Sequence, residues 1–230
     1  MWPWEDKLTE RDKKVFEAGG YGRRQGLGNR PAVLVIDVAY AFVGDRPEPI
    51  LESIKRWRNS SGEEGWQAVA AIQSILPLAR AKKVPVFYTV PAPRQQAADY
   101  GRWATKNRRA LESSPESAVN GYDIVSDIAP QEGEIVISKP KPSAFFGTPL
   151  LSYLIQLGVD SLVVTGGTTS GCVRASVVDA FSYNYKVALV MEGLFDRGQA
   201  SHAINLFDMQ AKYADVVSLS EIEEYFHNLA

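Results

Sequence analysis

The sequence is poor in the residues that form disulfides and metal sites. Its 230 residues include one cysteine and two histidines. A single cysteine excludes an internal disulfide and is typical of a reducing compartment, so we expect a cytoplasmic protein. Because cysteine and histidine are the usual zinc ligands, their scarcity argues against a structural zinc site. We therefore expect neither a metal nor a cofactor.

Strong net charge and long apolar runs are also missing. The formal net charge is −2, and no apolar run approaches the roughly 20 residues of a membrane-spanning helix. The first ten residues, MWPWEDKLTE, lack the charged-then-apolar order of a signal peptide. These absences predict a protein that binds neither nucleic acid nor membrane.

Short apolar runs alternate with helical patterns along most of the chain. Runs typical of buried strands occupy residues 32–37, 84–90, 134–139, 161–166 and 186–193, with a weaker one at 216–220. Helical periodicity covers residues 66–83, 148–158 and 172–183. This alternation predicts a three-layer α/β/α fold, similar to a Rossmann fold, with a central, mainly parallel six-stranded sheet.

The length and composition predict one large domain, residues 31–230, preceded by a polar, glycine-rich arm, residues 1–30. We expect the arm to lie on the surface or on another subunit. The irregular stretch 91–114 is too long for a simple connector. It is typical of either a lid or a subunit contact.

Three reactive residues stand at or just after predicted strand ends: Asp37, Lys139 and Cys172. In open α/β sheets, ligands bind beyond the carboxyl ends of the strands, which can bring these residues together. Cys172 falls in the first turn of a predicted helix, where unpaired N–H groups lower a thiol pKa. Taken singly, each has a structural alternative: a loop cap for the aspartate, a solvated strand end for the lysine, a small core residue for the cysteine.

Together the three have complementary chemistry. A carboxylate can accept the thiol proton, and an ammonium group can stabilise both anions. The same carboxyl group can protonate a leaving amine and then activate water. This set indicates hydrolysis of an amide-like bond through a covalent intermediate on Cys172.

Four segments resemble the cysteine hydrolases of the isochorismatase-like superfamily. They are RPAVLVIDVAYAF (30–42), EIVISKPKPSAFFGTPL (134–150), VTGGTTSGCVRASVVDAFSY (164–183) and DRGQASHAINLFDMQAKYADV (196–216). Within the superfamily, the chain is most similar to the branch of N-carbamoylsarcosine amidase, maleamate amidase and biuret hydrolase. This branch suggests a homo-oligomer, with a tetramer favoured.

The resemblance implies a role for several positions. Asp37, Lys139 and Cys172 correspond to the catalytic aspartate, lysine and nucleophile. A cis peptide bond is implied between Gly167 and Thr168, with the N–H groups of Thr168 and Cys172 forming an oxyanion hole. The chain departs from its relatives at Ala39, where many have glutamine, and at the prolines flanking Lys141. The region between the first two strands also lacks the metal-binding histidines of nicotinamidase-type relatives.

Substrate binding is predicted at three residues. Relatives that act on carboxylate-bearing amides use an arginine at the position of Arg197, although an ion pair with Asp196 or Asp179 is the structural alternative. The Thr168 and Thr169 hydroxyls can bind substrate or serve only the turn. We expect His202 to be a structural hydrogen-bonding group.

The sequence thus predicts an amidohydrolase that releases ammonia from a small amide, and Arg197 favours an anionic one. Its substrate is expected to resemble N-carbamoylsarcosine, maleamate or biuret. Two alternatives remain open at this point: a non-catalytic small-molecule-binding protein and a thiol redox protein on the same fold. A low thiol pKa is expected for the hydrolase and for the redox protein.

Overall fold

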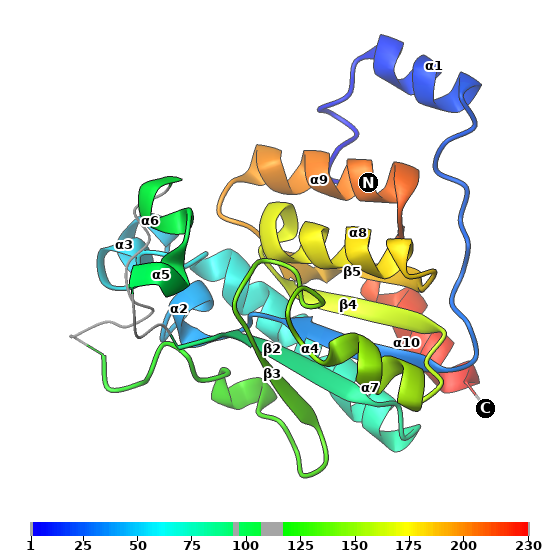
Figure 1. Ribbon diagram of the computed structural model, residues 1–230. Coiled ribbons are helices and arrows are strands. Elements are labelled where there is room, and N and C mark those ends of the chain that lie inside the picture. The colour runs from blue at the N-terminus through cyan, green and yellow to red at the C-terminus, as the bar shows by residue number, and fades with distance from the viewer. Residues whose placement is uncertain (1, 94–96, 107–116, 230) are drawn as a thin grey trace.

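The computed structural model describes residues 2–93, 97–106 and 117–229. Its centre is a six-stranded sheet with the order β3-β2-β1-β4-β5-β6, in which every pair of neighbours is parallel (Figure 1). The strands are β1 (Pro31–Ile36), β2 (Val86–Pro91), β3 (Ile135–Lys139), β4 (Ser161–Gly167), β5 (Lys186–Phe195) and β6 (Asp215–Val217). The predicted fold class is confirmed.

Helices connect the strands and cover both faces of the sheet. The α-helices are α1 (Glu10–Ala18), α2 (Tyr40–Val43), α3 (Ile50–Arg56), α4 (Glu63–Ala81), α5 (Ala97–Tyr100), α6 (Trp103–Lys106), α7 (Leu150–Gln156), α8 (Arg174–Ser182), α9 (Gln199–Lys212) and α10 (Leu219–Asn228). A 3₁₀ turn, η1 (Ser126–Ile128), precedes β3, and a π-helical turn, η2 (Thr169–Val173), precedes α8.

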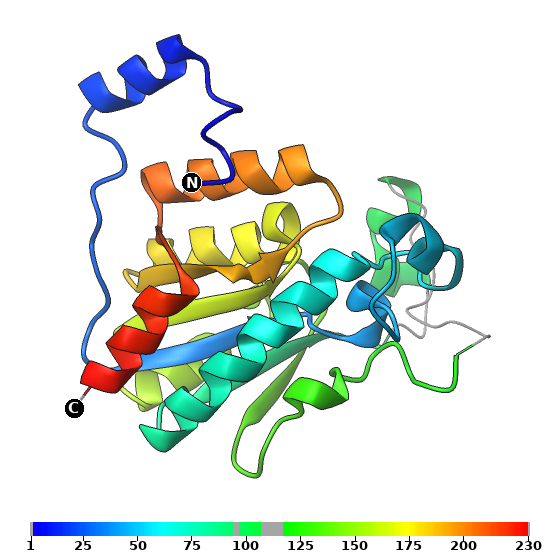
Figure 2. The ribbon, with the colours of Figure 1, turned by 180° about the vertical axis from the view of Figure 1, so that it is seen from behind.

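The two faces of β1 belong to two separate hydrophobic cores. Val33 and Val35 pack with α4 and α10, whereas Leu34 and Ile36 pack with α7, α8 and α9. Figure 2 shows α4 and α10 together on the rear face. Successive strand side chains point to opposite faces, so a strand buried on both sides must be apolar throughout. This is why the run AVLVI is continuous rather than alternating.

The strand order reverses direction at β1. The chain passes from β1 to β2 and β3 on one side, then returns to β4 on the other side of β1. Gly166 near the end of β4 has φ +99°, and a Cβ there would lie 2.1 Å from the Ile36 carbonyl oxygen. Only glycine permits this close approach, which brings the ends of β1 and β4 together at the switch point.

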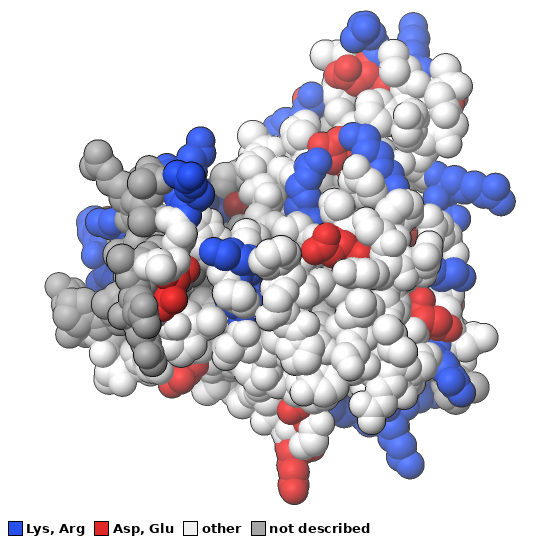
Figure 3. Space-filling view, in the orientation of Figure 1, with Lys and Arg blue, Asp and Glu red and all other residues white. Residues whose placement is uncertain are grey.

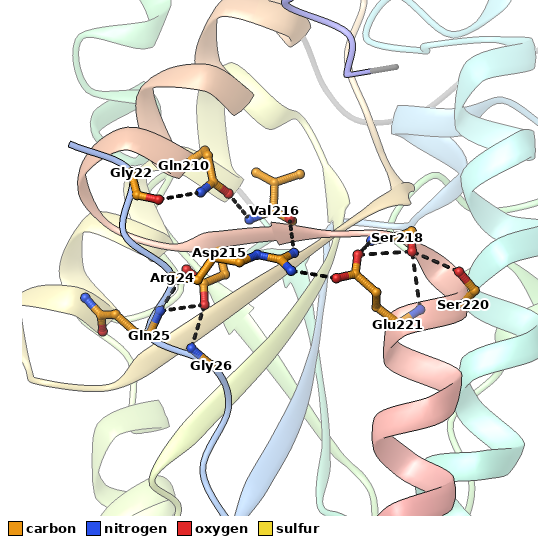
Figure 4. Close-up of polar contacts among 10 residues, drawn as sticks. All are labelled: Gly22, Arg24, Gln25, Gly26, Gln210, Asp215, Val216, Ser218, Ser220 and Glu221. Carbon is orange, nitrogen blue, oxygen red and sulfur yellow. Dashed lines mark hydrogen bonds and ion pairs between the residues drawn. The ribbon is translucent and has the colours of Figure 1, made fainter. Parts of the chain in front are cut away.

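The described part of the arm, residues 2–30, lies along the protein's own surface. Trp4 is buried against α9, where its ring centroid is 6.3 Å from that of Phe207, and Phe16 of α1 contacts the same ring at 4.7 Å. Helix α1 itself projects from the body, and the chain then runs past β6 and α10 (Figure 1). There the buried carboxylate of Asp215 accepts hydrogen bonds from the backbone N–H groups of Gln25 and Gly26 (Figure 4).

Charged side chains are scattered over the face seen in Figure 3, and its central part is largely uncharged. No continuous basic stripe crosses this face. Among the residues that the structure describes, no helix combines the length and apolar character needed to cross a membrane.

Candidate active site

Asp37 directly follows β1 and is almost completely buried, with 1% of its surface exposed. Its backbone takes a left-handed conformation, φ 52°, which turns the chain away from the sheet. The backbone N–H donates to the Thr89 carbonyl oxygen at 3.0 Å and to the Thr89 hydroxyl at 3.2 Å. The Thr89 hydroxyl in turn donates to Asp37 Oδ1 at 2.9 Å. Both the backbone and the side chain of Asp37 are therefore fixed by the adjacent strand β2.

Lys139 ends β3 and reaches across β2 toward the switch point. Its Nζ lies 2.7 Å from Asp37 Oδ2 and donates hydrogen bonds to Cys172 Sγ and to the Lys141 carbonyl oxygen, each at 3.3 Å. An ammonium group has three protons, so these three acceptors use all of them. Burial lowers the pKa of Lys139, but the charges of Asp37 and Cys172 outweigh it and raise that pKa overall. Lys139 is therefore cationic in the folded protein.

Cys172 lies in η2, the turn that leads into α8, and the structure places it beside Lys139 as the strand-end argument predicted. The turn is held from both sides. Ser170 N–H donates to Asp196 Oδ2 at 2.7 Å, and the Ser176 hydroxyl donates to the Cys172 carbonyl oxygen at 2.7 Å. Ser176 also accepts a hydrogen bond from the Ala144 N–H. The turn that carries Cys172 is thus tied to the residue after β5 and to the loop that follows Lys139.

The expectation of a low thiol pKa is wrong for this structure. Burial raises the pKa of the Cys172 thiol to about 11; Lys139 lowers it, and the charge and hydrogen bonding of Asp37 raise it. Burial in low dielectric penalises the thiolate directly and is the largest cause of the shift. At neutral pH the sulfur therefore keeps its proton and needs a base when it reacts.

The peptide bond between Gly167 and Thr168 is cis, as the resemblance implied. A Cβ on Gly167 would lie 2.3 Å from the Phe195 ring, so glycine is required there. The Thr168 side chain makes no capping hydrogen bond to the turn that follows it. Thr169 differs: it is fully buried, and its hydroxyl contacts the Phe195 carbonyl oxygen at 3.1 Å and His202 Nδ1 at 2.8 Å. Those contacts assign the Thr169 hydroxyl to the turn rather than to substrate.

His202 has the structural role that the sequence predicted. Its pKa is lowered by burial, although the nearby Asp196 carboxylate opposes the shift. A neutral ring is therefore favoured beside the Thr169 hydroxyl.

Arg197 follows β5 on the exposed surface of this end of the sheet. Its Nε donates to the Asn59 carbonyl oxygen at 2.8 Å, and its Nη2 contacts the same oxygen. The Asp196 carboxylate accepts a hydrogen bond from the backbone N–H of Arg197, at 2.8 Å, rather than from its guanidinium group. Asp179, the other ion-pair partner considered for Arg197, accepts a hydrogen bond from the Ser143 hydroxyl at 2.5 Å. The guanidinium is thus oriented by the segment after α3.

The positions that depart from related sequences have clear surroundings. Ala39 is fully buried and forms an antiparallel bridge with Ile124. The Lys141 carbonyl oxygen accepts a hydrogen bond from the Lys139 ammonium group. The Lys141 ammonium group lies 5.7 Å from the centroid of the Trp103 ring. Trp103 belongs to the stretch 91–114, which therefore contacts the loop after β3. Residues 94–96 and 107–114 of this stretch lie outside the described residues.

Three contributors to the site were missed by the sequence reasoning: Thr89, Asp196 as a turn acceptor, and Ser176. Thr89 stands near the end of a predicted strand, so the strand-end argument could have found it. The other two carry no local signal, because their role depends on contacts between distant elements. Among the described residues, no group of three or more histidine, cysteine, aspartate or glutamate side chains is arranged to hold a metal ion.

Comparison with known proteins places the chain in a family. The model of the isochorismatase domain matches residues 31–221. The chain belongs to the isochorismatase family. An N-carbamoylsarcosine amidase of Arthrobacter sp. is 34% identical over 241 residues, covering 98% of this chain and 84% of the relative. A maleamate amidohydrolase of Pseudomonas putida is 33% identical over 216 residues, covering 92% of this chain and 94% of the relative.

Solved structures of this family have the same fold. A cysteine hydrolase from Pseudomonas syringae pv. phaseolicola superposes with a TM-score of 0.78 at 21% identity, covering 91% of this chain and 98% of that one. An N-carbamoylsarcosine amidase from Thermoplasma acidophilum gives a TM-score of 0.62 at 21% identity, covering 83% of this chain and 96% of that one. At such identities the likeness shows the fold alone.

Proposed function

We propose that this member of the isochorismatase family is a cysteine-dependent amidohydrolase that releases ammonia from a small carbamoyl or primary-amide compound. The observation that carries the proposal is the buried contact of Lys139 with both Asp37 and Cys172 at the switch point of the sheet. The two relatives named as an amidase and an amidohydrolase support the same reaction class.

The first half of the proposed reaction forms a covalent intermediate. The Cys172 sulfur attacks the amide carbon as its proton passes to Asp37, because a thiol with a pKa of about 11 is not ionised beforehand. The carbonyl electrons move onto oxygen, which the N–H groups of Thr168 and Cys172 are proposed to stabilise. Collapse of this adduct breaks the C–N bond, and the Asp37 proton leaves with ammonia.

The second half regenerates the thiol. Water gives a proton to Asp37 and adds to the thioester carbon, and collapse breaks the C–S bond. The proton returns to sulfur and the acid product leaves. Lys139 keeps its charge throughout, because all three of its protons have acceptors and it opposes the negative charge that moves between Asp37 and sulfur.

The substrate class is inferred from Arg197, which directly follows Asp196 after β5. Arg197 is a cation whose fork suits a carboxylate, which favours an anionic amide such as an N-carbamoyl amino acid or maleamate. The Thr168 hydroxyl is proposed as a second substrate contact beside the nucleophile. A cytoplasmic location and a homotetramer remain predictions from the sequence.

The raised thiol pKa argues against the alternative of a redox-sensing thiol. Oxidation of cysteine follows the thiolate fraction, which burial keeps small here. A non-catalytic binding protein would have no use for an ammonium ion buried between a carboxylate and a thiol.

Ammonia release tests the proposal directly. The wild type and Cys172→Ala are compared on N-carbamoylsarcosine, maleamate, biuret, N-carbamoyl amino acids and nicotinamide. We expect turnover of at least one compound by the wild type and none by the variant. Equal turnover by the two proteins, or none across the panel by the wild type, would reject the proposed activity.

A further inference from the structure

The two carboxylate oxygens of Asp37 have different partners. Oδ2 lies 2.7 Å from Lys139 Nζ, the atom that also donates to Cys172 Sγ, whereas Oδ1 accepts the Thr89 hydroxyl at 2.9 Å. Thr89 lies in β2 with 1% of its surface exposed, and its backbone partner in the sheet register is Ile36, the residue before Asp37. The threonine is thus held beside the carboxylate by the strand pairing itself.

The direction of the Thr89 hydroxyl proton is set by its neighbours. The hydroxyl oxygen already accepts the Asp37 N–H at 3.2 Å. Its single proton therefore points to Oδ1, which is its carboxylate acceptor. A proton placed on Oδ1 would break this bond or force the hydroxyl to rotate inside a buried site.

We propose that Thr89 is a positioning residue that assigns the proton transfers of Asp37 to one oxygen, Oδ2. With Oδ1 occupied by the Thr89 hydroxyl, the proton arriving from Cys172 is received on the oxygen beside Lys139. From there it departs with the leaving ammonia. Thr89 touches neither substrate nor sulfur in this role; it acts through Asp37. The inference rests on the proposed function and adds a residue to it.

The chain contains a matched control for removing this hydroxyl. Thr165 lies in β4, on the other side of β1, and is fully buried, with a hydroxyl that has no hydrogen-bond partner among the described residues. Both threonines are interior strand residues, and valine has nearly the same shape as threonine. Thr165→Val therefore reproduces the steric change of Thr89→Val without removing a hydrogen bond.

Steady-state kinetics separate the two variants. Loss of a hydrogen bond to a charged group lowers kcat by on the order of 10- to 100-fold in Thr89→Val, with KM changed by less than about threefold. Thr89→Ser, which keeps the hydroxyl, is expected to recover most of kcat, and Thr165→Val to match the wild type. Equal kcat values for Thr89→Val and Thr165→Val would overturn the assignment.

The pH profile gives a readout that a purely structural role would not move. A donor to the ionised carboxylate favours that form, so its loss shifts the acidic limb of kcat/KM to higher pH in Thr89→Val but not in Thr165→Val. If Thr89→Val fails to fold by circular dichroism, Thr89→Ala is measured in its place against Thr89→Ser. Unchanged profiles in folded variants would reject the proposal.

Alkylation of the single cysteine distinguishes failure of this inference from failure of the proposed activity. Iodoacetamide labels Cys172 without any amide substrate. Without Thr89, more negative charge remains on the carboxylate that bonds to the thiol, so labelling at pH 8 to 9 becomes slower than in Thr165→Val. If Thr89→Val is labelled more slowly than Thr165→Val but the wild type hydrolyses no amide, the proposed activity is rejected and the role of Thr89 is retained. Equal labelling rates would reject that role.

Discussion

Asp37 and Lys139 form a buried ion pair, 2.7 Å from Oδ2 to Nζ, and its two members act in opposite directions on the Cys172 thiol. Asp37 raises the thiol pKa by its charge and its hydrogen bond, and Lys139 lowers it. The thiol therefore stays protonated at rest. In the proposed reaction, Asp37 takes this proton when the sulfur attacks the substrate.

Substitution of either charge should move the thiol pKa in a defined direction. Asp37→Asn should lower it, so that iodoacetamide labels Cys172 faster at neutral pH, even though ammonia release is lost. Lys139→Met should raise it and slow the labelling. Because the chain has one cysteine, the label reports only this site. Faster labelling of Lys139→Met than of the wild type would contradict the assigned electrostatics.

The effect of replacing Arg197 on KM should depend on the charge of the substrate. Arg197→Gln is expected to raise KM for an anionic amide by about tenfold or more, because a bidentate ion pair to the carboxylate is lost. A neutral substrate such as biuret should be affected little. Arg24→Gln, which removes an arginine paired with Glu221 beside the edge strand β6, is the control. An equal KM increase for charged and neutral amides would show that Arg197 does not bind a carboxylate.

The segment of the arm beside β6 should be stabilised by one buried carboxylate, that of Asp215. Asp215→Ala leaves the N–H groups of Gln25 and Gly26 without their acceptor and should lower the free energy of unfolding by about 1–3 kcal/mol. Arg24→Met removes a neighbouring ion pair that is nearly half exposed and should cost about 1 kcal/mol or less. Urea denaturation compares the two. A larger loss for Arg24→Met than for Asp215→Ala would refute this anchor.

The two histidines provide a test of stability against pH. Burial lowers the pKa of His202 in the folded protein, so below about pH 6.5 the unfolded chain binds a proton that the folded protein refuses. As the pH is lowered from that point, the free energy of unfolding should decrease until the folded-state pKa of His202 is reached. His202→Asn should remove this part of the decline, and the exposed His227→Asn should not. Identical pH dependence in both variants would rule out His202 as its source.

Local sequence patterns determined the fold class and the identities of the three reactive residues. Apolar runs such as residues 32–37 are continuous because both sides of the strand are covered, and that requirement is visible in the sequence itself. Parallel strands also place their carboxyl ends at one edge, so residues at or just after those ends could be grouped as Asp37, Lys139 and Cys172 before any contact was known.

The tertiary structure decided what depends on distance and burial. No local signal places the Lys139 ammonium across β2, gives the Thr89 hydroxyl to Oδ1 of Asp37, or turns Arg197 toward the Asn59 carbonyl. The thiol pKa reversed its expected direction for the same reason. A helix start is a local feature of the chain, but the dielectric around a sulfur depends on every element packed over it, and only the folded arrangement specifies that environment.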